Sequence, residues 1–297
     1  MRRWGSVRYT MLFLLASCGR LGFDERTVVG DGNQPDTPPP CTAYTPWSVA
    51  TIVPGINDPS EDAGPVLTHD GLTLYFQSFR NLTSLDIYIA TRPSLAADFG
   101  PPIALAQGFI NTSANDRDAV LAAGDTRMYL SSDGSSTLAV VAVDSMFVAT
   151  GSGDTFGPRS ALAELGLDVY GPWVSDDELE MYYSTSSGAL QRAVRSASTD
   201  SWTPMGTSSL GPGGYPAFSA DGHTIYFQRA GTAVPQIFTA MRAQLDDSFS
   251  APTVVDVGMS FAGGVGDPFV TADNLELYFV GSAGLSTDIY RLTRACL

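Results

Sequence analysis

Pro216-Ala-Phe-Ser-Ala-Asp-Gly-His-Thr-Ile-Tyr226-Phe227 is the stretch that decides the fold, because it encodes a strand, a tight turn and a second strand. Its turn, Asp221-Gly222, contains residues that tolerate positive φ, as a two-residue hairpin requires. The residues after the turn alternate as a half-buried strand does. The same pattern occurs in five segments, residues 65–76, 119–130, 172–183, 216–227 and 268–279. Five hairpins of one type predict a repeat architecture.

A third and a fourth strand follow the hairpins. The third is clearest in Asp86-Ile-Tyr-Ile-Ala-Thr-Arg92 and in residues 236–242 and 288–294, and we expect weaker versions at Leu138 to Val143 and Ala189 to Arg195. The fourth begins with an aromatic residue shortly before a proline, as in Phe99-Gly-Pro101. The tyrosines of the second strands are 54, 53, 44 and 52 residues apart (Tyr75, Tyr129, Tyr182, Tyr226 and Tyr278). Four strands per unit at this spacing are typical of β-propeller blades.

The two ends of the chain complete each other. The last copy stops after its third strand at Arg294, whereas Tyr44-Thr-Pro46 opens a segment of the fourth-strand type before the first copy. One N-terminal and three C-terminal strands would form the last blade and leave no open sheet edge in the ring. The sequence therefore predicts an all-β fold, a five-bladed β-propeller with four-stranded blades, closed by the N-terminal strand.

Closure of the ring also brings two of the three cysteines together. Cys296 follows the last third strand and Cys41 precedes the N-terminal fourth strand, so both lie where the loop between these strands would run. We expect a disulfide between them, which would persist in an oxidising compartment. The alternative is a pair of free or intermolecularly bonded thiols.

The N-terminus is typical of an export signal, with the basic pair Arg2-Arg3, an apolar run and then Leu15-Ala16-Ser17-Cys18. This arrangement resembles the bacterial lipobox, which implies lipidation of Cys18 and stable membrane anchoring. The alternative is an ordinary secretory signal with an incidental cysteine. We expect a signal peptide over residues 1–17, a lipid anchor and disordered Pro-rich tether over 18–40, and the propeller over 41–297. Gly19 carries no aspartate-type inner-membrane retention signal, which favours the outer membrane, with the periplasmic or surface face left open.

Composition narrows the classes of partner. The chain has 31 acidic and 16 basic residues and a formal charge of −15, so it would repel the phosphate backbone of a nucleic acid. We therefore expect no nucleic-acid partner. Charged residues make up 16% of the chain, and its 30 glycines and 19 prolines fit many short strands and turns.

The repeat Pro-x-x-Ser/Thr-x-Asp-Gly-x-x-Leu/Ile-Tyr-Phe, with Asp-Ile-Tyr and aromatic-x-Pro after it, resembles the WD-repeat-like propeller repeats of TolB-type proteins and of envelope lipoproteins. The resemblance covers about residues 44–294. It implies partners among envelope proteins or cell-wall glycans, and we expect a monomer. TolB-type propellers have more blades than the five counted in this sequence.

Carboxylates are the candidates for chemistry. There is no Ser-His-Asp spacing and no His or Cys cluster fit for a transition metal, and the two histidines, His69 and His223, fall in hairpin turns. Asp62, Asp118 and Asp267 precede innermost strands and are expected to converge on one opening, where a glycan-active hydrolase would need one protonated and one ionised carboxyl. The alternative is that each acid bonds backbone amides of a neighbouring loop. Acids and carbonyls also suit Ca²⁺, but no loop has EF-hand spacing, so we predict no cofactor and no metal site.

The same face is also a candidate ligand platform. Loops that join each fourth strand to the next first strand should ring one mouth of the channel. Tyr170, Trp173 and Tyr215 are candidates for stacking on a sugar or a partner side chain, together with Asp62, Asp118 and Asp267; the alternative is aromatic packing between blades. Our leading hypothesis is a lipid-anchored, non-catalytic binding or scaffold module. The alternatives are a glycan-active hydrolase and a purely architectural protein.

Overall fold

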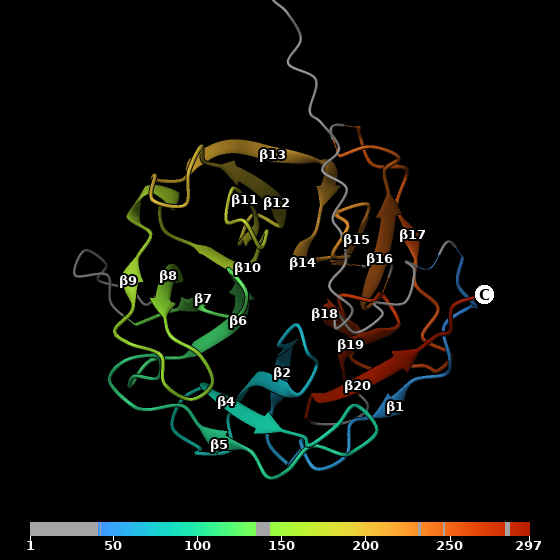
Figure 1. Ribbon diagram of the computed structural model, residues 1–297, viewed down its shortest axis with the longest axis horizontal. Helices are drawn as coiled ribbons and strands as arrows, with labels where there is room; N and C mark the ends of the chain where they lie inside the picture. The colour runs from blue at the N-terminus through green and yellow to red at the C-terminus, as the bar shows by residue number, and fades with distance from the viewer. Residues whose placement is uncertain (1–40, 42, 135–142, 231–232, 246, 283–285) are drawn as a thin grey trace, which may run out of the picture. The chain divides into compact units, whose positions relative to one another are not determined.

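The computed structural model describes residues 41, 43–134, 143–230, 233–245, 247–282 and 286–297. All of these belong to one compact unit, Pro40–Leu297. Five antiparallel four-stranded sheets are arranged around a centre (Figure 1). The predicted all-β, five-bladed propeller is confirmed. Apart from one 3₁₀ helix, η1 (Ala163–Leu165), no helix occurs in the described residues, and nothing in this part of the chain is a helix long and apolar enough to cross a membrane.

Each blade runs from an innermost strand at the channel to an outer fourth strand. Blade 1 contains β2 (Asp62–Leu67), β3 (Thr73–Ser78), β4 (Asp86–Thr91) and β5 (Ile103–Ala104). Blade 2 contains β6 (Asp116–Ala122), β7 (Arg127–Ser132), β8 (Ser145–Thr150) and β9 (Ser160–Ala161). Blade 3 contains β10 (Val169–Val174), β11 (Glu180–Thr185), β12 (Ala189–Val194) and β13 (Thr203–Pro212). Blade 4 contains β14 (Gly214–Phe218), β15 (Thr224–Ala230), β16 (Pro235–Met241) and β17 (Thr253–Val254). Blade 5 contains β18 (Val265–Val270), β19 (Glu276–Gly281), β20 (Asp288–Thr293) and β1 (Thr51–Ile52).

The channel has two distinct ends because all five innermost strands run in the same direction. We call the end where these strands begin, after the loop from the preceding blade, the loop end. We call the end where they turn back into the second strands the turn end. The loop end is bordered by residues 55–61, 108–115, 166–168, 210–213 and 259–264, and the turn end by residues 68–72, 123–126, 175–179, 219–223 and 271–275.

The ring closes as predicted. The N-terminal strand β1 pairs with β20, with Ile52 opposite Tyr290. Further out, the Thr45 amide donates to the Ala295 carbonyl at 2.9 Å. Cys41 and Cys296 form a disulfide, with their Cα atoms 5.4 Å apart across a sequence separation of 255 residues. The first and last described segments are therefore joined both by hydrogen bonds and covalently.

One strand lies elsewhere than the sequence predicted. The third strand of blade 2 was expected at Leu138 to Val143, but it is β8, Ser145–Thr150, and residues 138–142 lie outside the described residues. The run Ser145-Met-Phe-Val-Ala-Thr150 is apolar on both faces: Phe147 and Ala149 enter the interface with blade 1, and Met146 and Val148 enter the interface with blade 3. The expected third strand of blade 3 is confirmed as β12.

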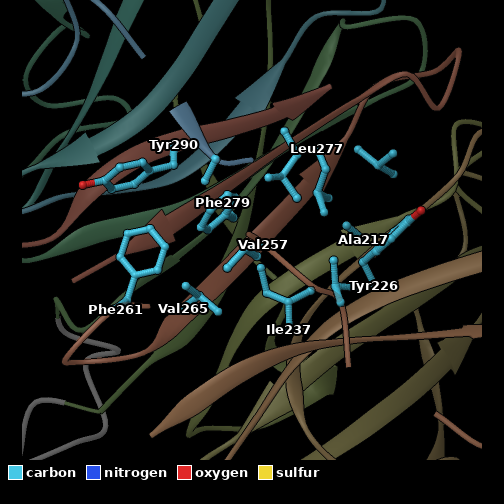
Figure 2. Close-up of a cluster of buried hydrophobic side chains, with 13 residues drawn as sticks. Ala217, Tyr226, Ile237, Val257, Phe261, Val265, Leu277, Phe279 and Tyr290 are labelled. Atoms are coloured by element: carbon cyan, nitrogen blue, oxygen red, sulfur yellow. The ribbon is translucent and has the colours of Figure 1, made fainter. Parts of the chain in front are cut away.

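The repeated Tyr-Phe pair explains how the blades pack on each other. Neighbouring strand residues point to opposite faces of a sheet, so the two side chains of a pair enter two different interfaces. Tyr226 packs between blades 4 and 5, whereas Phe227 packs between blades 3 and 4. All five hydrophobic clusters of the described residues fill such an interface between neighbouring blades. Figure 2 shows the cluster between blades 4 and 5, where Phe279 and Tyr290 face Ile237 and Tyr226.

An arginine after the third strand braces four of the five blades. Its Nε donates to a carbonyl of the hairpin turn in the same blade, and its guanidinium stacks on the aromatic residue that opens the fourth strand. These arginine and aromatic pairs are Arg92 and Phe99, Arg195 and Trp202, Arg242 and Phe249, and Arg294 and Tyr44. In blade 2 the position is Gly151, whose amide makes the corresponding backbone bond to Thr126. The aromatic-x-Pro signal thus marks a cation–π stack.

Candidate functional site

Five equivalent residues of the innermost strands line the channel in the left-handed conformation. They are Gly64, Asp118, Gly171, Tyr215 and Asp267, with φ between 46° and 58°. Each lies at a register shift, so every innermost strand carries a bulge at the same height. These residues border a small cavity of about 100 Å³ inside the channel. Positive φ costs little at glycine and strains a tyrosine, so blade 4 holds its Tyr215 conformation at the expense of stability.

The backbone amides of these bulges are fixed by the preceding blade. The Asp118 amide donates to Gln77 Oε1 at 2.7 Å, and the Tyr215 amide donates to Ser184 Oγ at 2.9 Å. The Gly171 and Asp267 amides donate in the same way to Ser131 Oγ and Gln228 Oε1. Blade 5 has Val280 at the acceptor position, which offers no side-chain oxygen. The Gly64 amide instead donates to the Asp267 carboxyl, so that carboxyl completes the ring of hydrogen bonds.

Asp118 is buried and only 6% exposed. One of its carboxyl oxygens, Oδ2, accepts a hydrogen bond from the Gly171 amide at 3.2 Å and lies 3.9 Å from Arg117 Nε. Burial raises the pKa of Asp118 to about 6; the Arg117 charge opposes this shift, and Asp144 adds to it. Arg117 is itself paired with Asp144, at 2.5 Å between Nη2 and Oδ1. The carboxyl of Asp118 is therefore half-ionised near pH 6 and mostly ionised at neutral pH.

Asp267 titrates later than Asp118. The pKa of Asp267 is raised to about 8, first by burial and then by the charge of Asp118. The Gly64 hydrogen bond and the Arg117 charge act in the opposite direction. At neutral pH the pair thus holds a proton on Asp267 while Asp118 is mostly ionised. One protonated and one ionised carboxyl is the combination that general acid and base catalysis uses.

Two tyrosines lie beside the acid pair toward the loop end. The rings of Tyr170 and Tyr215 are 5.6 Å apart between centroids, and the Tyr170 hydroxyl donates to the Thr185 carbonyl at 3.3 Å. Burial and then the charge of Asp118 raise the pKa of both hydroxyls, so both remain neutral donors. Together with Arg117, the two rings form a partly exposed group that we call the tyrosine mouth. Arg117 and Asp144 were not singled out from the sequence, because their pairing joins distant segments.

Trp173 has a different position. Its ring lies 4.1 Å from the Phe218 ring between centroids, in the next blade, and 6.2 Å from Tyr182. It also lines the channel, two residues beyond the bulge at Gly171. Of the three predicted aromatic candidates, Tyr170 and Tyr215 are brought together, whereas Trp173 packs between blades deeper in the channel.

Asp62 does not share the opening. It is fully buried in blade 1, where its Oδ2 accepts the Asp58 amide at 2.7 Å and its Oδ1 pairs with Arg80 Nη2 at 2.6 Å. Its equivalent in blade 2 is Asp116, which accepts the Thr112 amide in the same way. The blade 1 residue at the height of Asp118 and Asp267 is glycine 64. Of the three carboxylates expected to converge, only Asp118 and Asp267 border the same cavity, because Asp62 lies two residues before the bulge position of its strand.

The groups around the acid pair are hydrogen-bond donors and one cation. In the described part of the chain no three His, Cys, Asp or Glu side chains are grouped as metal ligands would be. Around the acid pair, the charged partner is a cation, Arg117, and the neighbours of the carboxyls are amide donors. These are groups that satisfy a carboxylate in place of a metal ion.

Comparison with known proteins places the fold. No protein-family model matches the sequence, and no curated protein matches it. Among solved structures, the chain is similar to the α-L-arabinofuranosidase PaAbf62A from Podospora anserina in complex with cellotriose, with a TM-score of 0.59, 9% identity, and coverage of 85% of this chain and 97% of that one. A GH62 hydrolase in complex with xylotriose gives 0.56 at 10% identity, covering 84% and 97%. A putative TolB from Agrobacterium tumefaciens gives 0.50 at 18% identity, covering 82% and 80%. These likenesses show a β-propeller shared by hydrolases and TolB proteins.

Proposed function

We propose that the protein is a lipid-anchored envelope binding module that holds an envelope glycan or protein at the tyrosine mouth without catalysis. The observation that carries this proposal is the pair of tilted rings, Tyr170 and Tyr215, beside Arg117 at the loop end of the channel. Flat rings next to hydrogen-bonding groups suit the apolar face and the hydroxyls of a sugar, and equally a partner's side chain.

The size of the channel favours binding over catalysis. The cavity beside Asp118 and Asp267 is about 100 Å³, below the roughly 300 Å³ at which ligand pockets begin. A sugar ring therefore does not reach the position between the two carboxyls, and both carboxyls already accept backbone amides. The acid pair instead ties the blades together below the mouth.

The hydrolase remains the second candidate because Asp118 and Asp267 line one cavity and burial raises the pKa of both carboxyls, more at Asp267 than at Asp118. A glycosidase needs this combination, and the arabinofuranosidase neighbours share the fold. Opening of the channel by a substrate would be required. Release of reducing sugar that Asp118→Asn abolishes would establish this candidate against the first.

Membrane attachment is the other part of the proposal. The expected lipid site, Cys18, and the export signal lie outside the described residues, and their support is the sequence Leu15-Ala16-Ser17-Cys18. We propose the outer membrane for the anchor because the residue after Cys18 is Gly19 and not an aspartate-type inner-membrane retention signal. Metabolic labelling with a fatty-acid analogue should mark the wild-type chain and not Cys18→Ala; equal labelling of both would contradict lipidation at this cysteine.

Binding is tested with the full chain purified in mild detergent. The probes are cellotriose, xylotriose and peptidoglycan fragments, read by calorimetry, and an envelope extract, read by pull-down. Tyr170→Ala should reduce capture of the ligand about tenfold or more, whereas Tyr170→Phe, which keeps the ring, should retain most of it. If no probe binds, or if Tyr170→Ala binds as well as wild type, the tyrosine mouth is not the binding site.

A further inference from the structure

A second, larger cavity lies at the opposite end of the channel from the tyrosine mouth. It measures about 900 Å³ and is bordered by hairpin turns, so it opens at the turn end. Ligand pockets in proteins range from about 300 to 1,000 Å³, and this cavity is near the upper limit. It is distinct from the proposed binding site, because neither Tyr170 nor Tyr215 lines it.

One wall of this turn-end cavity is a connected set of turns. The blade 1 residue His69 donates its amide to Asp125 Oδ2 at 2.9 Å, and its Nδ1 lies 2.8 Å from Asp125 Oδ1. The next link is the amide of Gly124, which donates to Asp176 Oδ1 of blade 3 at 2.8 Å. Ala123, Gly124 and Asp125 all have positive φ, so the blade 2 turn is built to reach both neighbours. The opposite wall contains Leu245 and the blade 4 turn at Asp221.

The floor of the turn-end cavity is apolar. Trp173 and Phe218 stack there at 4.1 Å between centroids, and Phe269 and Leu121 complete the surface. Leu245 stands at the rim with 59% of its surface exposed. Phe218 is already buried, but an apolar group that covers the partly exposed Trp173, Phe269 and Leu121 would remove them from water, at a gain of about 25 cal/mol per Å².

Acidic side chains outnumber arginines around the rim, since five acids and three arginines line the cavity together with His69. Two of the arginines form ion pairs, Arg192 with Glu180 at 2.6 Å and Arg195 with Glu178 at 3.3 Å, whereas Arg242 Nε donates to the Gly222 carbonyl at 2.9 Å. The Asp176 side chain is 59% exposed, and its Oδ1 lies 3.7 Å from His69 Nε2. Asp177 and Asp221 each use one carboxyl oxygen within their own turn, and within the described residues the second oxygen of each accepts no hydrogen bond. The rim is thus complementary to a cation.

We propose that the turn-end cavity binds a segment of a partner protein in which an apolar side chain stands next to lysine or arginine. The apolar side chain lies on Trp173 and Phe218, and the cationic group reaches Asp176 and Asp221. Two features carry the assignment, the apolar floor and the excess of acidic over basic side chains around it, among which Asp177 and Asp221 each keep one carboxyl oxygen without a hydrogen bond in the described residues. The chain's formal charge of −15 adds long-range attraction for such a segment.

The repeat supplies matched control positions. Leu95 in blade 1 and Leu245 in blade 4 occupy the same place after the third strand and are 60% and 59% exposed, but only Leu245 lines the cavity. Asp70 and Asp221 likewise occupy the same turn position and make the same bonds within their turns, but only Asp221 lines the cavity. Each pair separates the cavity from the structural role of the residue.

The test is a calorimetric titration of the full chain with a capped hexapeptide of alternating lysine and phenylalanine. One control peptide has glutamate in place of lysine, and another has serine in place of phenylalanine. We expect the first peptide to bind and both controls to bind at least about tenfold more weakly. Leu245→Ser should weaken binding about tenfold and Asp221→Asn about threefold, whereas Leu95→Ser, Asp70→Asn and Tyr170→Ala should leave the affinity unchanged.

Three results would overturn the proposal. One is absence of binding of the lysine and phenylalanine peptide to the folded wild-type chain. Another is binding of the glutamate peptide with equal affinity, which would remove the role of the acidic rim. The last is an equal loss of affinity in both members of a matched pair, for example Leu245→Ser and Leu95→Ser, because that would place the peptide outside the cavity. Thermal unfolding of each variant shows that it is folded before titration.

Discussion

Asp118 and Asp267 occupy the same left-handed bulge in blades 2 and 5, and the charge of Asp118 raises the pKa of Asp267. Each carboxyl accepts the amide of the bulge in the next blade, Gly171 for Asp118 and Gly64 for Asp267. The pair therefore links the blades around the channel and stores a proton at neutral pH. This arrangement has consequences for stability that can be measured.

Stability should fall as the pH rises from about 4 to about 8. The pKa is raised from 3.8 to about 6 at Asp118 and to about 8 at Asp267, mainly by burial, so the folded state binds more protons than the unfolded state in this window. The free energy of unfolding is then highest below pH 4 with respect to these groups and declines as each folded-state pKa is passed, by at most about 1.4 kcal/mol per pH unit and group.

Asp267→Asn should remove much of this pH dependence and should be more stable than wild type above pH 8. Asparagine keeps an acceptor for the Gly64 amide, tolerates positive φ and carries no charge to bury. Asp98→Asn, at an exposed position, is the control and should follow the wild-type profile. Urea unfolding between pH 4 and 9 measures this. Parallel profiles for wild type and Asp267→Asn would contradict the assignment of the buried proton.

Tyr129→Phe should destabilise the protein by about 1–3 kcal/mol. The Tyr129 hydroxyl donates to the buried Glu178 carboxyl and accepts from Arg195 at 3.1 Å, across the interface of blades 2 and 3. Loss of the hydroxyl leaves Glu178, which is 3% exposed, with one partner fewer. Tyr183→Phe is the control, because the Tyr183 hydroxyl makes no hydrogen bond among the described residues. Denaturant midpoints that shift equally in both variants would refute the role of the Tyr129 hydroxyl.

Gly171→Ala should be more destabilising than Gly153→Ala. Gly171 and Gly153 have φ of 54° and 58°, so an alanine at either position is strained by the left-handed conformation to a similar extent. A Cβ at residue 171 would lie 2.9 Å from Tyr215 Cδ1, whereas one at residue 153 would meet no atom within 4 Å. We expect an additional loss of about 1–3 kcal/mol in Gly171→Ala. Equal thermal midpoints for the two variants would mean that the bulges around the channel are not tightly packed.

Removal of both cysteines, by Cys41→Ser with Cys296→Ser, should lower the free energy of unfolding by up to about 5 kcal/mol. The bond spans a sequence separation of 255 residues, and its loss raises the conformational entropy of the unfolded chain, which favours unfolding. Denaturant unfolding of the variant and of the reduced wild-type chain should agree. Unchanged stability in both would show that the hydrogen bonds from Thr45 and Ile52 close the ring unaided.

The fold was predictable because its signals are local and repeated. Turn residues such as Asp221-Gly222, and the alternation at Tyr226-Phe227, specify a hairpin within a few residues, and five copies leave one arrangement of strands. The disulfide followed from the order of strands alone. The blade 2 third strand was misplaced because that copy lacks the Asp-Ile-Tyr run and has Gly151 in place of the bracing arginine.

The candidate site was predictable only in part. Asp118 and Asp267 were found, but Asp62 was grouped with them because the two-residue offset along a strand is invisible when only acidic residues are compared. A usable signal was present: the bulge is the residue directly before Pro65, Pro172, Pro216 and Pro268 in four copies. Arg117 with Asp144, and the turn-end cavity, depend on contacts between distant turns that no local pattern encodes.

The most direct test of the account is to follow binding and turnover of one glycan on the same sample of full chain. Peptidoglycan fragments, cellotriose and xylotriose are titrated and then assayed for new reducing ends. We predict binding that Tyr170→Ala weakens about tenfold and Asp118→Asn leaves intact, with no release of reducing sugar. Turnover that disappears in Asp118→Asn would contradict the account and identify the channel pair as catalytic.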